Sequence, residues 1–363
     1  MTALSLHEFH RGLNGVFAKL NDAEVVDHYG NVLAEHAALS TSAGVIDLSF
    51  RSRLCVSGAD RQRFLNGQVT NDVKSLKTGE GCYAALVNAK GRIQSDLNIY
   101  VLDNEILLDF EPGYSGPVTQ RLEKYIIADD VAVTDVAAQY GLLSVQGPAS
   151  ADVVGSLDPG RELPGRPMNF NFRKDQRLGE IYIMCHSRAG STGYDLFAPI
   201  ASLSSIMDQL LEKARSAGGG ACGWQAFEIA RIEAGVPRFG ADMDETNLAP
   251  EAGIEDRAIS YSKGCYIGQE VIARIRTYGE VARVLRGLRL PDDIETLPIR
   301  GDKLFKDDKE IGGITSAVRS PALKANVALG YVRREHKTPG NKLTVRTARG
   351  DCVATVVPLP FRA

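Results

Sequence analysis

The residues best suited to chemistry lie between positions 263 and 274. The first eight, Lys-Gly-Cys-Tyr-Ile-Gly-Gln-Glu, combine an ammonium, a thiol, an amide and a carboxylate, and two glycines keep the chain open. Apolar side chains follow at helical spacing as far as Gly279, which predicts that Cys265 lies in a turn just before a helix. The helix dipole and the cations Lys263 and Arg274 would favour its thiolate, the form that attacks electrophiles and binds metals. The alternative is a small buried cysteine in a tight turn, since free cysteine commonly packs as a small hydrophobe.

A second candidate group is a carboxylate on a predicted strand. Gln94, Asp96 and Asn98 alternate along the chain, so they share one face of that strand. Polar residues on one face of a strand are commonly just the solvent-exposed side of the sheet. Asp96 is a candidate functional residue only if that face lines a cleft. The strand belongs to an antiparallel meander with short turns. The predicted strands of this meander are 82–87, 93–101 and 105–110.

The rest of the chain mixes helices and strands before position 282 and changes to short strands after it. The run 218–223 matches GxGxxG by letter, but it follows a helix, so it is interpreted as a loop and not as a dinucleotide site. Short apolar runs that alternate with Pro, Gly and Asp turns predict a separate C-terminal β domain or barrel. Further helices are expected at 59–65, 117–127, 149–157, 203–217 and 225–234, and further strands at 53–57, 142–145, 180–186, 194–198, 284–290, 303–305, 310–315, 326–332, 342–346 and 352–357.

The composition is that of an ordinary globular protein with more than one domain. The 363 residues exceed what one core commonly supports, and 44% are hydrophobic and 24% charged. The net charge of −3 argues against a generic polyanion binder. Residues 257–289 carry seven Lys/Arg against two Glu, which would attract an anionic ligand or simply form a solvated face. Few aromatic residues lie among these cations, so direct nucleic-acid binding is not expected.

Cysteine usage and the first residues indicate a reducing compartment, taken to be the cytoplasm. The six cysteines form no CxxC pair, which argues against a zinc site and against a disulfide framework. Neither a signal peptide nor an apolar stretch of about 18 residues is found, so no membrane span is expected. His7 and His10 are three positions apart, whereas a helical zinc pair needs four, so no metal site is expected.

The motif at 263–270 with Arg274 resembles the signature of the YgfZ family of folate-binding proteins, which includes relatives that assist iron–sulfur cluster assembly. Most of the chain is similar, more widely, to the aminomethyltransferase superfamily and its T-protein of the glycine cleavage system. T-proteins lack the Lys-Gly-Cys motif. The segments with T-protein-like counterparts are 44–49, 70–73, 145–148, 232–235, 314–316 and, more loosely, 360–362.

The resemblance implies an α+β fold, arranged as a T-protein-like ring of three domains around tetrahydrofolate. Two interleaved α+β subdomains would form a folate-binding region at 1–280, and a C-terminal β-barrel would follow at 281–363. A monomer suits the superfamily. The two subdomains would comprise roughly 1–50 with 140–240 and 51–139 with 241–280.

The resemblance also implies roles for individual residues. Asp96 falls on the catalytic aspartate of T-proteins, and Tyr83 on a tyrosine that lines the folate. Asp195 falls near a glutamate that grips the pterin, where one carboxylate pairs two N–H donors. Ser95 in place of an acid, Phe227 in place of an arginine, and a shortened loop count against full T-protein chemistry. The folate site is expected to include Tyr83, Asp96, Asp195, Gln269, Glu270, Arg274 and Arg362.

The favoured function is a role beside iron–sulfur enzymes. The protein would bind tetrahydrofolate and use Cys265 in their synthesis or repair, with indirect effects on tRNA modification and with client or assembly proteins as partners. Cys265 would be a nucleophile, a redox centre or a transient cluster ligand, with Lys263 and Arg274 stabilising its thiolate. Gln269 and Glu270 would cap the helix start or bond the backbone on the folate side.

The alternative function is a folate-dependent aminomethyl- or methyltransferase. Asp96 would then be the acid that assists near N5 and N10 of the folate. A scaffold protein with a vestigial pocket is the remaining interpretation. Across these hypotheses the catalytic candidates are Cys265, Lys263 and Asp96.

Overall fold

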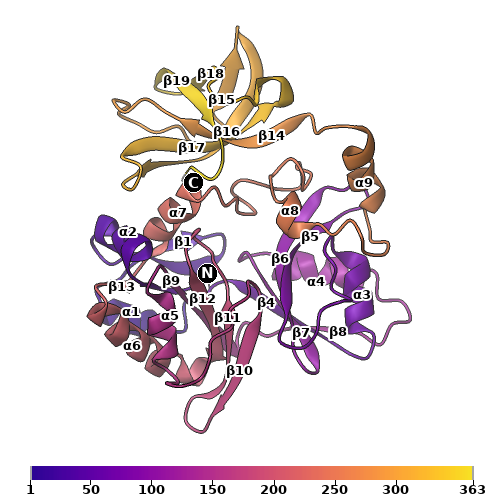
Figure 1. Cartoon of the computed structure of the whole chain (residues 1–363), viewed down its shortest axis with the longest axis vertical. Coiled ribbons are helices and arrows are strands. Elements are labelled where there is room, and N and C mark those ends of the chain that lie inside the picture. The colour runs from indigo at the N-terminus through magenta and orange to yellow at the C-terminus, as the bar shows by residue number, and fades with distance from the viewer. Residues whose placement is uncertain (1, 362–363) are drawn as a thin grey trace. The chain divides into compact units, whose positions relative to one another are not determined.

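The computed structural model describes residues 2–361, apart from the side chain of Tyr278, in two compact units. The first unit comprises the chain up to Leu86 together with Ser95–Glu228, and the second comprises Val87–Gln94 with the chain from Ile229 onward. Helices and strands are mixed in the first unit, whereas the second contains a closed β-barrel (Figure 1). The predicted α+β class with a C-terminal barrel is confirmed.

One sheet of the first unit has the strand order β10-β11-β12-β9-β3-β13. Helix α6 (Ile200–Ser216) packs on it because its apolar residues recur every three or four positions and form one buried stripe. That stripe is Leu203, Ile206, Met207, Leu210, Leu211 and Ala214. The other elements of this layer are β3 (Gly44–Asp47), β9 (Tyr140–Gln146), β10 (Phe170–Asp175), β11 (Gly179–Cys185), β12 (Gly193–Pro199), β13 (Gly220–Ala221), α2 (Val32–Thr41) and α5 (Ser150–Gly155).

The second sheet has the order β5-β6-β7-β4-β8, with α3 and α4 beside it (Figure 1). Leu54, Val56, Leu97, Ile99 and Leu108 alternate along its strands and build one apolar core. The same strands carry charged residues on their other face, and these residues form the candidate site. The elements are β4 (Ser52–Ser57), β5 (Gly81–Val87), β6 (Ile93–Val101), β7 (Glu105–Phe110), β8 (Ala132–Asp135), α3 (Arg61–Gln68) and α4 (Ser115–Glu123).

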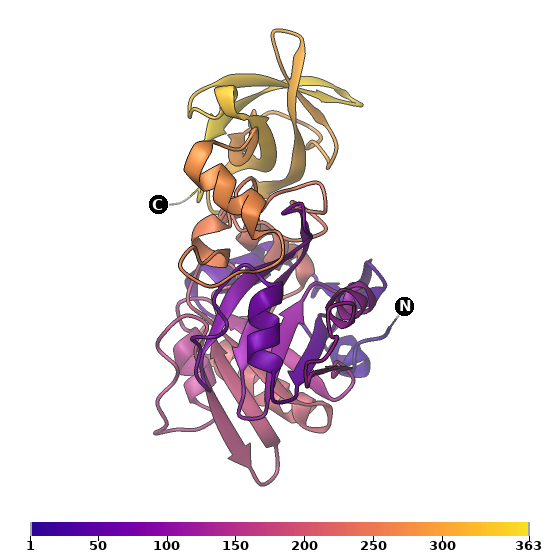
Figure 2. The same ribbon diagram turned by 90° about the vertical axis from the view of Figure 1, so that its right-hand side faces the viewer.

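The barrel closes in the order β14-β17-β16-β15-β18-β19, and its strands are drawn in orange to yellow in Figure 2. Inside the second unit, Arg231 ion-pairs with Asp242, whose Oδ1 accepts hydrogen bonds from Thr315 Oγ1 at 2.6 Å and Ser316 Oγ at 2.7 Å. This contact gives a structural reason for the T-protein-like segment 314–316. The elements are α7 (Trp224–Glu233), α8 (Glu255–Ala258), α9 (Gln269–Tyr278), β14 (Arg283–Arg289), β15 (Lys303–Lys306), β16 (Lys309–Ser320), β17 (Ala325–Arg333), β18 (Lys342–Thr347) and β19 (Gly350–Val357).

Most predicted elements are confirmed, and the errors concentrate near the N-terminus. The strands β6 and β7 have the predicted limits, and every predicted barrel strand is present. The run 218–223, expected to be a loop, contains a short strand, Gly220–Ala221, that is parallel to β3. No helix within residues 2–361 combines the length and apolar character that crossing a bilayer requires. The elements that were not predicted are α1 (His7–Gly12), β1 (Val16–Leu20), β2 (Ala23–His28), α2, β3, β8, β10, β13, α8 and a 3-10 helix at Arg334–His336.

Candidate functional site

Asp96 and Tyr83, both proposed from sequence, are in direct contact. Tyr83 on β5 donates its hydroxyl to Asp96 Oδ2 on β6, with 2.9 Å between the oxygens. Asp96 Oδ1 is buried and has no hydrogen-bond partner among the described residues. An unpaired buried carboxylate oxygen is unfavourable by itself, so it is suited to accept a hydrogen bond from a ligand.

The electrostatic surroundings of Asp96 keep it ready to exchange a proton. Burial raises the pKa of Asp96 to about 6, and repulsion by Glu111 adds to this effect, whereas Arg51 and the Tyr83 hydrogen bond lower it. A carboxyl that titrates near the working pH is populated in both protonation states. It can therefore act as an acid or as a base toward a bound substrate.

Asp96→Asn is expected to stabilise the folded protein near neutral pH. The folded pKa of about 6 lies above the ordinary aspartate value of about 3.9. The stabilisation linked to this group is therefore present at low pH and is lost as the pH rises through about 6. An amide keeps the acceptor for Tyr83 without the charge. Urea unfolding should show a gain of about 1–3 kcal/mol at about pH 8 and much less at about pH 4; equal gains at both pH values would contradict the raised pKa.

Asp195 lies in a buried ionic network rather than alone. Its Oδ2 accepts hydrogen bonds from Arg188 Nε at 2.8 Å and from His186 Nδ1 at 2.9 Å. Its Oδ1 is buried and has no partner among the described residues. Burial alone would raise the pKa of Asp195, but Arg188 and His186 hold it below the ordinary value. Only one oxygen is thus left for a ligand, whereas the expected pairing with a pterin needs both.

His186 is held neutral with its proton on Nδ1. Burial and the neighbouring Arg188 lower the pKa of His186. Because a carboxylate only accepts hydrogen bonds, the Nδ1 atom that contacts Asp195 must be the protonated nitrogen. The hydroxyl of Tyr100 lies 3.1 Å from the same nitrogen.

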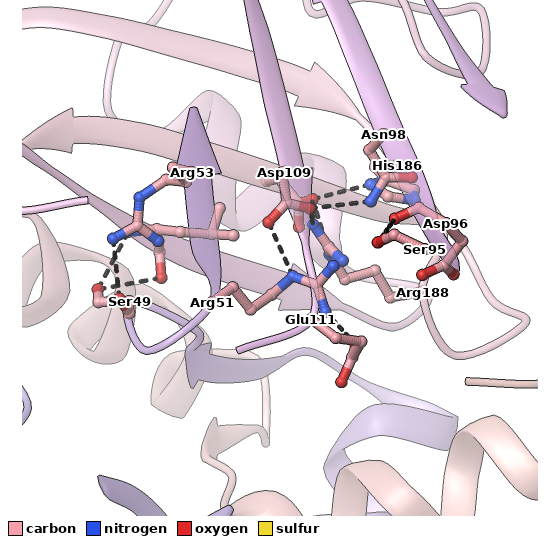
Figure 3. A network of polar contacts seen from close by, with 12 residues as sticks. Ser49, Arg51, Arg53, Ser95, Asp96, Asn98, Asp109, Glu111, His186 and Arg188 are labelled. Atoms are coloured by element: carbon pink, nitrogen blue, oxygen red, sulfur yellow. Dashed lines mark hydrogen bonds and ion pairs between the residues drawn. The ribbon is translucent and has the colours of Figure 1, made fainter. Parts of the chain in front are cut away.

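Arg188 and Arg51 both bind Asp109 on β7, the strand next to the one that carries Asp96 (Figure 3). Arg188 Nη2 lies 2.7 Å from Asp109 Oδ2, and Arg51 Nε lies 2.8 Å from Asp109 Oδ1. Arg51 also pairs with Glu111, the carboxylate that repels Asp96. Burial alone would raise the pKa of Asp109, but the two guanidinium groups hold it far below its ordinary value. Arg51, whose positive charge lowers the Asp96 pKa, therefore links Asp96 electrostatically through Asp109 and Arg188 to Asp195, and all of these residues belong to the first unit.

The cysteine motif lies in the second unit. Cys265 is exposed, whereas the other five cysteines are buried or intermediate. Lys263 is buried at 8% exposure, and its Nζ lies 5.0 Å from the centre of the Tyr266 ring. Gly268, with φ of 84°, occupies the N-cap of α9 and makes the chain reversal that a residue with a Cβ would resist. The predicted turn before a helix is confirmed, and the exposed thiol removes the alternative of a small buried cysteine.

The remaining predicted ligands have different surroundings. Arg274 and Glu270 are exposed on α9, and Gln269 is partly exposed at its first position. The N-cap residue of this helix is Gly268, which has no side chain to cap with, and the roles expected of Gln269 and Glu270 stay a prediction. Arg362 lies outside the described residues.

Phe227 and Ser95, the two residues that differ from their T-protein counterparts, are both buried. Phe227 is buried, and its ring lies against Trp224 with 5.4 Å between ring centres. Trp224 in turn contacts Phe50 edge to face at 5.5 Å. Ser95 is completely buried and donates its hydroxyl to the backbone oxygen of Asp96 at 3.1 Å. Neither residue supplies a charge to the site.

The arginines and acids that surround Asp96 were missed by sequence reasoning. A signal was available, because Asp109 stands inside an apolar strand and charged residues are almost never buried without a partner. Arg51 and Arg53 stand similarly at the start of β4. The sequence could not show which arginines pair with Asp109, since Arg51 and Arg188 lie 58 and 79 positions away along the chain.

Comparison with known proteins identifies the family. Residues 6–263 match the GCVT N-terminal domain, and residues 283–362 match the glycine cleavage T-protein C-terminal barrel domain. An aminomethyltransferase of Halalkalibacterium halodurans is 30% identical over 338 residues, which cover 92% of this chain and 90% of that protein. An aminomethyltransferase of Parafrankia sp. is 30% identical over 364 residues, which cover 98% and 96% of the two chains.

A solved structure shares the fold. The crystal structure of glycine cleavage system aminomethyltransferase T from Bartonella henselae superposes with a TM-score of 0.88 and 24% identity, and the match covers 99% of this chain and 98% of that one. The fold, both domain matches and the sequence identity agree over nearly the whole length. The chain belongs to the glycine cleavage T-protein family.

Proposed function

We propose that this protein binds tetrahydrofolate and transfers a one-carbon unit, as a folate-dependent aminomethyltransferase or methyltransferase. The observation that carries the proposal is Asp96, a carboxyl with a pKa of about 6 that is held by Tyr83 and keeps one buried oxygen unpaired. Relatives named aminomethyltransferase that are 30% identical to the chain support the same reaction class. We therefore favour the transferase, which was the alternative hypothesis from the sequence, over the iron–sulfur role.

The residues present fit a reduced folate. A pterin ring offers N–H donors, and the unpaired buried oxygens of Asp96 and Asp195 are acceptors that the protein leaves unsatisfied. The Asp195 carboxylate stays ionised because Arg188 and His186 lower its pKa, so it can receive a charge-assisted hydrogen bond. Tyr83 would contribute ring surface beside Asp96. The folate supplies the nitrogen atoms that carry the one-carbon unit.

Asp96 is assigned the proton transfer. Protonated, it would donate toward a nitrogen that becomes a leaving group, and ionised, it would stabilise positive charge that develops beside the carried carbon. Tyr83 fixes the carboxyl rotamer, because its hydroxyl bonds Oδ2 and leaves Oδ1 directed elsewhere. Asp96 populates both its protonated and its ionised form near neutral pH only because burial has raised its pKa.

The assay that tests this function supplies an aminomethylated lipoyl carrier protein and tetrahydrofolate, and it follows the release of ammonia. We expect release that depends on both components, since neither alone completes the transfer. Omission of tetrahydrofolate is the control. Ammonia release that is no faster than the background without enzyme would rule out the aminomethyl reaction, and a methyl donor would then be tested by following the methylated folate product.

A second candidate function rests on the exposed thiol. Cys265 is exposed, it stands between the buried Lys263 and the buried Tyr266, and the motif resembles the YgfZ signature. A protein that serves iron–sulfur enzymes would need an accessible thiol of this kind. Both candidate functions include folate binding. They differ in the residue that is indispensable, which is Asp96 for the transferase and Cys265 for the iron–sulfur role.

Cys265→Ser separates the two candidates. For the transferase we expect unchanged tetrahydrofolate affinity and less than about a threefold change in turnover, because the proposed proton transfer uses Asp96 and needs no thiol. For the iron–sulfur role we expect loss of rescue of iron–sulfur enzyme activity in a deletion strain. Cys352→Ser, on a partly buried barrel cysteine, is the matched control. Full rescue by Cys265→Ser would remove the second candidate.

A further inference from the structure

A cavity of about 600 Å³ in the second unit is not used by the proposed folate site. Strands β15, β16 and β17 of the barrel form one side of it, and residues 241–247 form the other. This volume lies in the range of sites for small organic molecules. None of the residues assigned to folate lines it.

The pattern of the barrel strands creates the hollow. Tyr331 on β17 pairs in register with Gly313 on β16, and Gly313 pairs with Lys303 on β15. Side chains at paired positions point to the same face of a sheet. The glycine therefore leaves space between a phenol on one side and an ammonium on the other. Gly312 is required beside it, because a Cβ there would lie 1.8 Å from the backbone oxygen of Tyr331.

The hydroxyl of Tyr331 has no hydrogen-bond partner among the described residues. The side chain is 6% exposed and belongs to the cavity wall. Burial, together with the neighbouring Asp242, raises its pKa, so the group is a neutral donor at any working pH. The guanidinium of Arg283 lies 5.1 Å from the centre of the Tyr331 ring and is partly exposed. A buried donor without an acceptor is unfavourable until a ligand satisfies it.

The charges around the cavity leave positive charge uncompensated. Arg300 pairs with Asp244 at 2.9 Å and Lys303 with Glu310 at 3.1 Å. Arg333 makes no ion pair or hydrogen bond through its side chain within the described range. Counting the lining groups with their direct ion-pair partners gives an excess of one cation. The cations are Arg231, Arg283, Arg300, Lys303 and Arg333, and the carboxylates are Asp242, Asp244, Glu251 and Glu310.

We propose that this cavity binds the phosphate group of a small phosphate monoester. A monoester is an anion near pH 7, which suits the net positive charge of the lining. Three phosphate oxygens can accept from Arg333, Lys303 and the Tyr331 hydroxyl, whereas a carboxylate offers only two oxygens. The space over Gly313 receives the organic part of the ligand.

Isothermal calorimetry with glycerol 3-phosphate, ribose 5-phosphate, adenosine monophosphate, inorganic phosphate and succinate tests the proposal. We expect at least one ester to bind one site per chain, about tenfold or more tighter than inorganic phosphate and than succinate. Inorganic phosphate that binds as tightly as every ester would overturn the assignment of a monoester. Succinate that binds as tightly as the esters would overturn the assignment of phosphate.

Three variants locate the binding. Arg333→Gln is expected to weaken the ester about tenfold or more, while Arg334→Gln, its exposed neighbour paired with Glu280, should change affinity less than about twofold. Tyr331→Phe removes the unpaired hydroxyl, so it should weaken binding about tenfold without lowering the melting temperature. Equal losses for Arg333→Gln and Arg334→Gln, or unchanged affinity for Tyr331→Phe, would overturn the site. Tetrahydrofolate titration of the same variants is expected to be unchanged, which separates this proposal from the folate proposal.

Discussion

Replacing Asp96 by asparagine is expected to lower kcat for folate-dependent transfer by about 10²- to 10⁴-fold, the range attributed to a positioned general acid or base. The amide has nearly the same shape and still accepts the hydrogen bond of Tyr83, but it cannot exchange a proton. The Kd for tetrahydrofolate should change much less than kcat, because the loss is confined to the reaction step. Steady-state turnover and folate calorimetry on the same preparation measure both effects.

Asp103→Asn is the matched control for this prediction. Asp103 follows β6, the strand of Asp96, and is exposed in the turn before β7, so the same chemical change there should leave kcat unaltered. The kcat of the wild type should also rise with an apparent pKa near 6 if the ionised form of Asp96 is the one required, or fall there if the protonated form is required. A variant Asp96→Asn that retains full turnover would contradict the assigned role.

Arg188→Met is expected to reduce the free energy of unfolding by about 3–5 kcal/mol, the range for removing one partner of a buried ion pair. Arg188 contacts both Asp109 and Asp195, and all three side chains are buried. Without the guanidinium, the buried carboxylates of Asp109 and Asp195 have less positive charge beside them. Urea unfolding at about pH 7 measures the change.

The double variant Arg188→Met with Asp195→Asn should regain part of that loss, because the uncompensated charge is removed together with its partner. Lys174→Met, which deletes one cation from the exposed pair with Glu180 on β10 and β11, is the control and should change stability little. A double variant that is less stable than Arg188→Met alone would contradict the charge argument.

The loss of stability in Arg188→Met is expected to depend on pH in one direction. The pKa values of Asp109 and Asp195 are lowered in the folded protein, so their stabilisation is present above the ordinary aspartate pKa of about 3.9 and is lost as the pH falls below it. The difference between wild type and Arg188→Met should therefore shrink below about pH 4. Asp96 acts in the opposite direction, because its pKa is raised.

Local patterns in the sequence predicted much of the fold. The barrel strands follow from short apolar runs between turn residues, and β6 and β7 follow from alternation with a short turn. The turn that presents Cys265 follows from Gly268 and the helical spacing after it. Several elements that escaped prediction are short or partly polar, such as β8 and β10, which alternate weakly and take their stability from neighbours distant in sequence.

The site was predicted less completely than the fold. Periodicity gives no sign that Tyr83 and Asp96 are in contact, and both residues were named through the resemblance to T-proteins. The pairing of Arg188 with Asp109 and Asp195 depends on bringing β7 of one sheet beside β12 of another, which no local pattern encodes. The limit on Asp195 was not predicted either, although Arg188 and His186, which occupy its Oδ2, are only seven and nine positions away along the chain.

Anaerobic calorimetric titration of the wild-type protein with tetrahydrofolate is the decisive test of the proposed folate site. We expect saturable binding at one site per chain, with proton uptake or release that changes across about pH 6 in the wild type and not in Asp96→Asn, because the carboxyl that titrates there faces the ligand. The absence of saturable heat, or a proton linkage that is the same in both proteins, would contradict it.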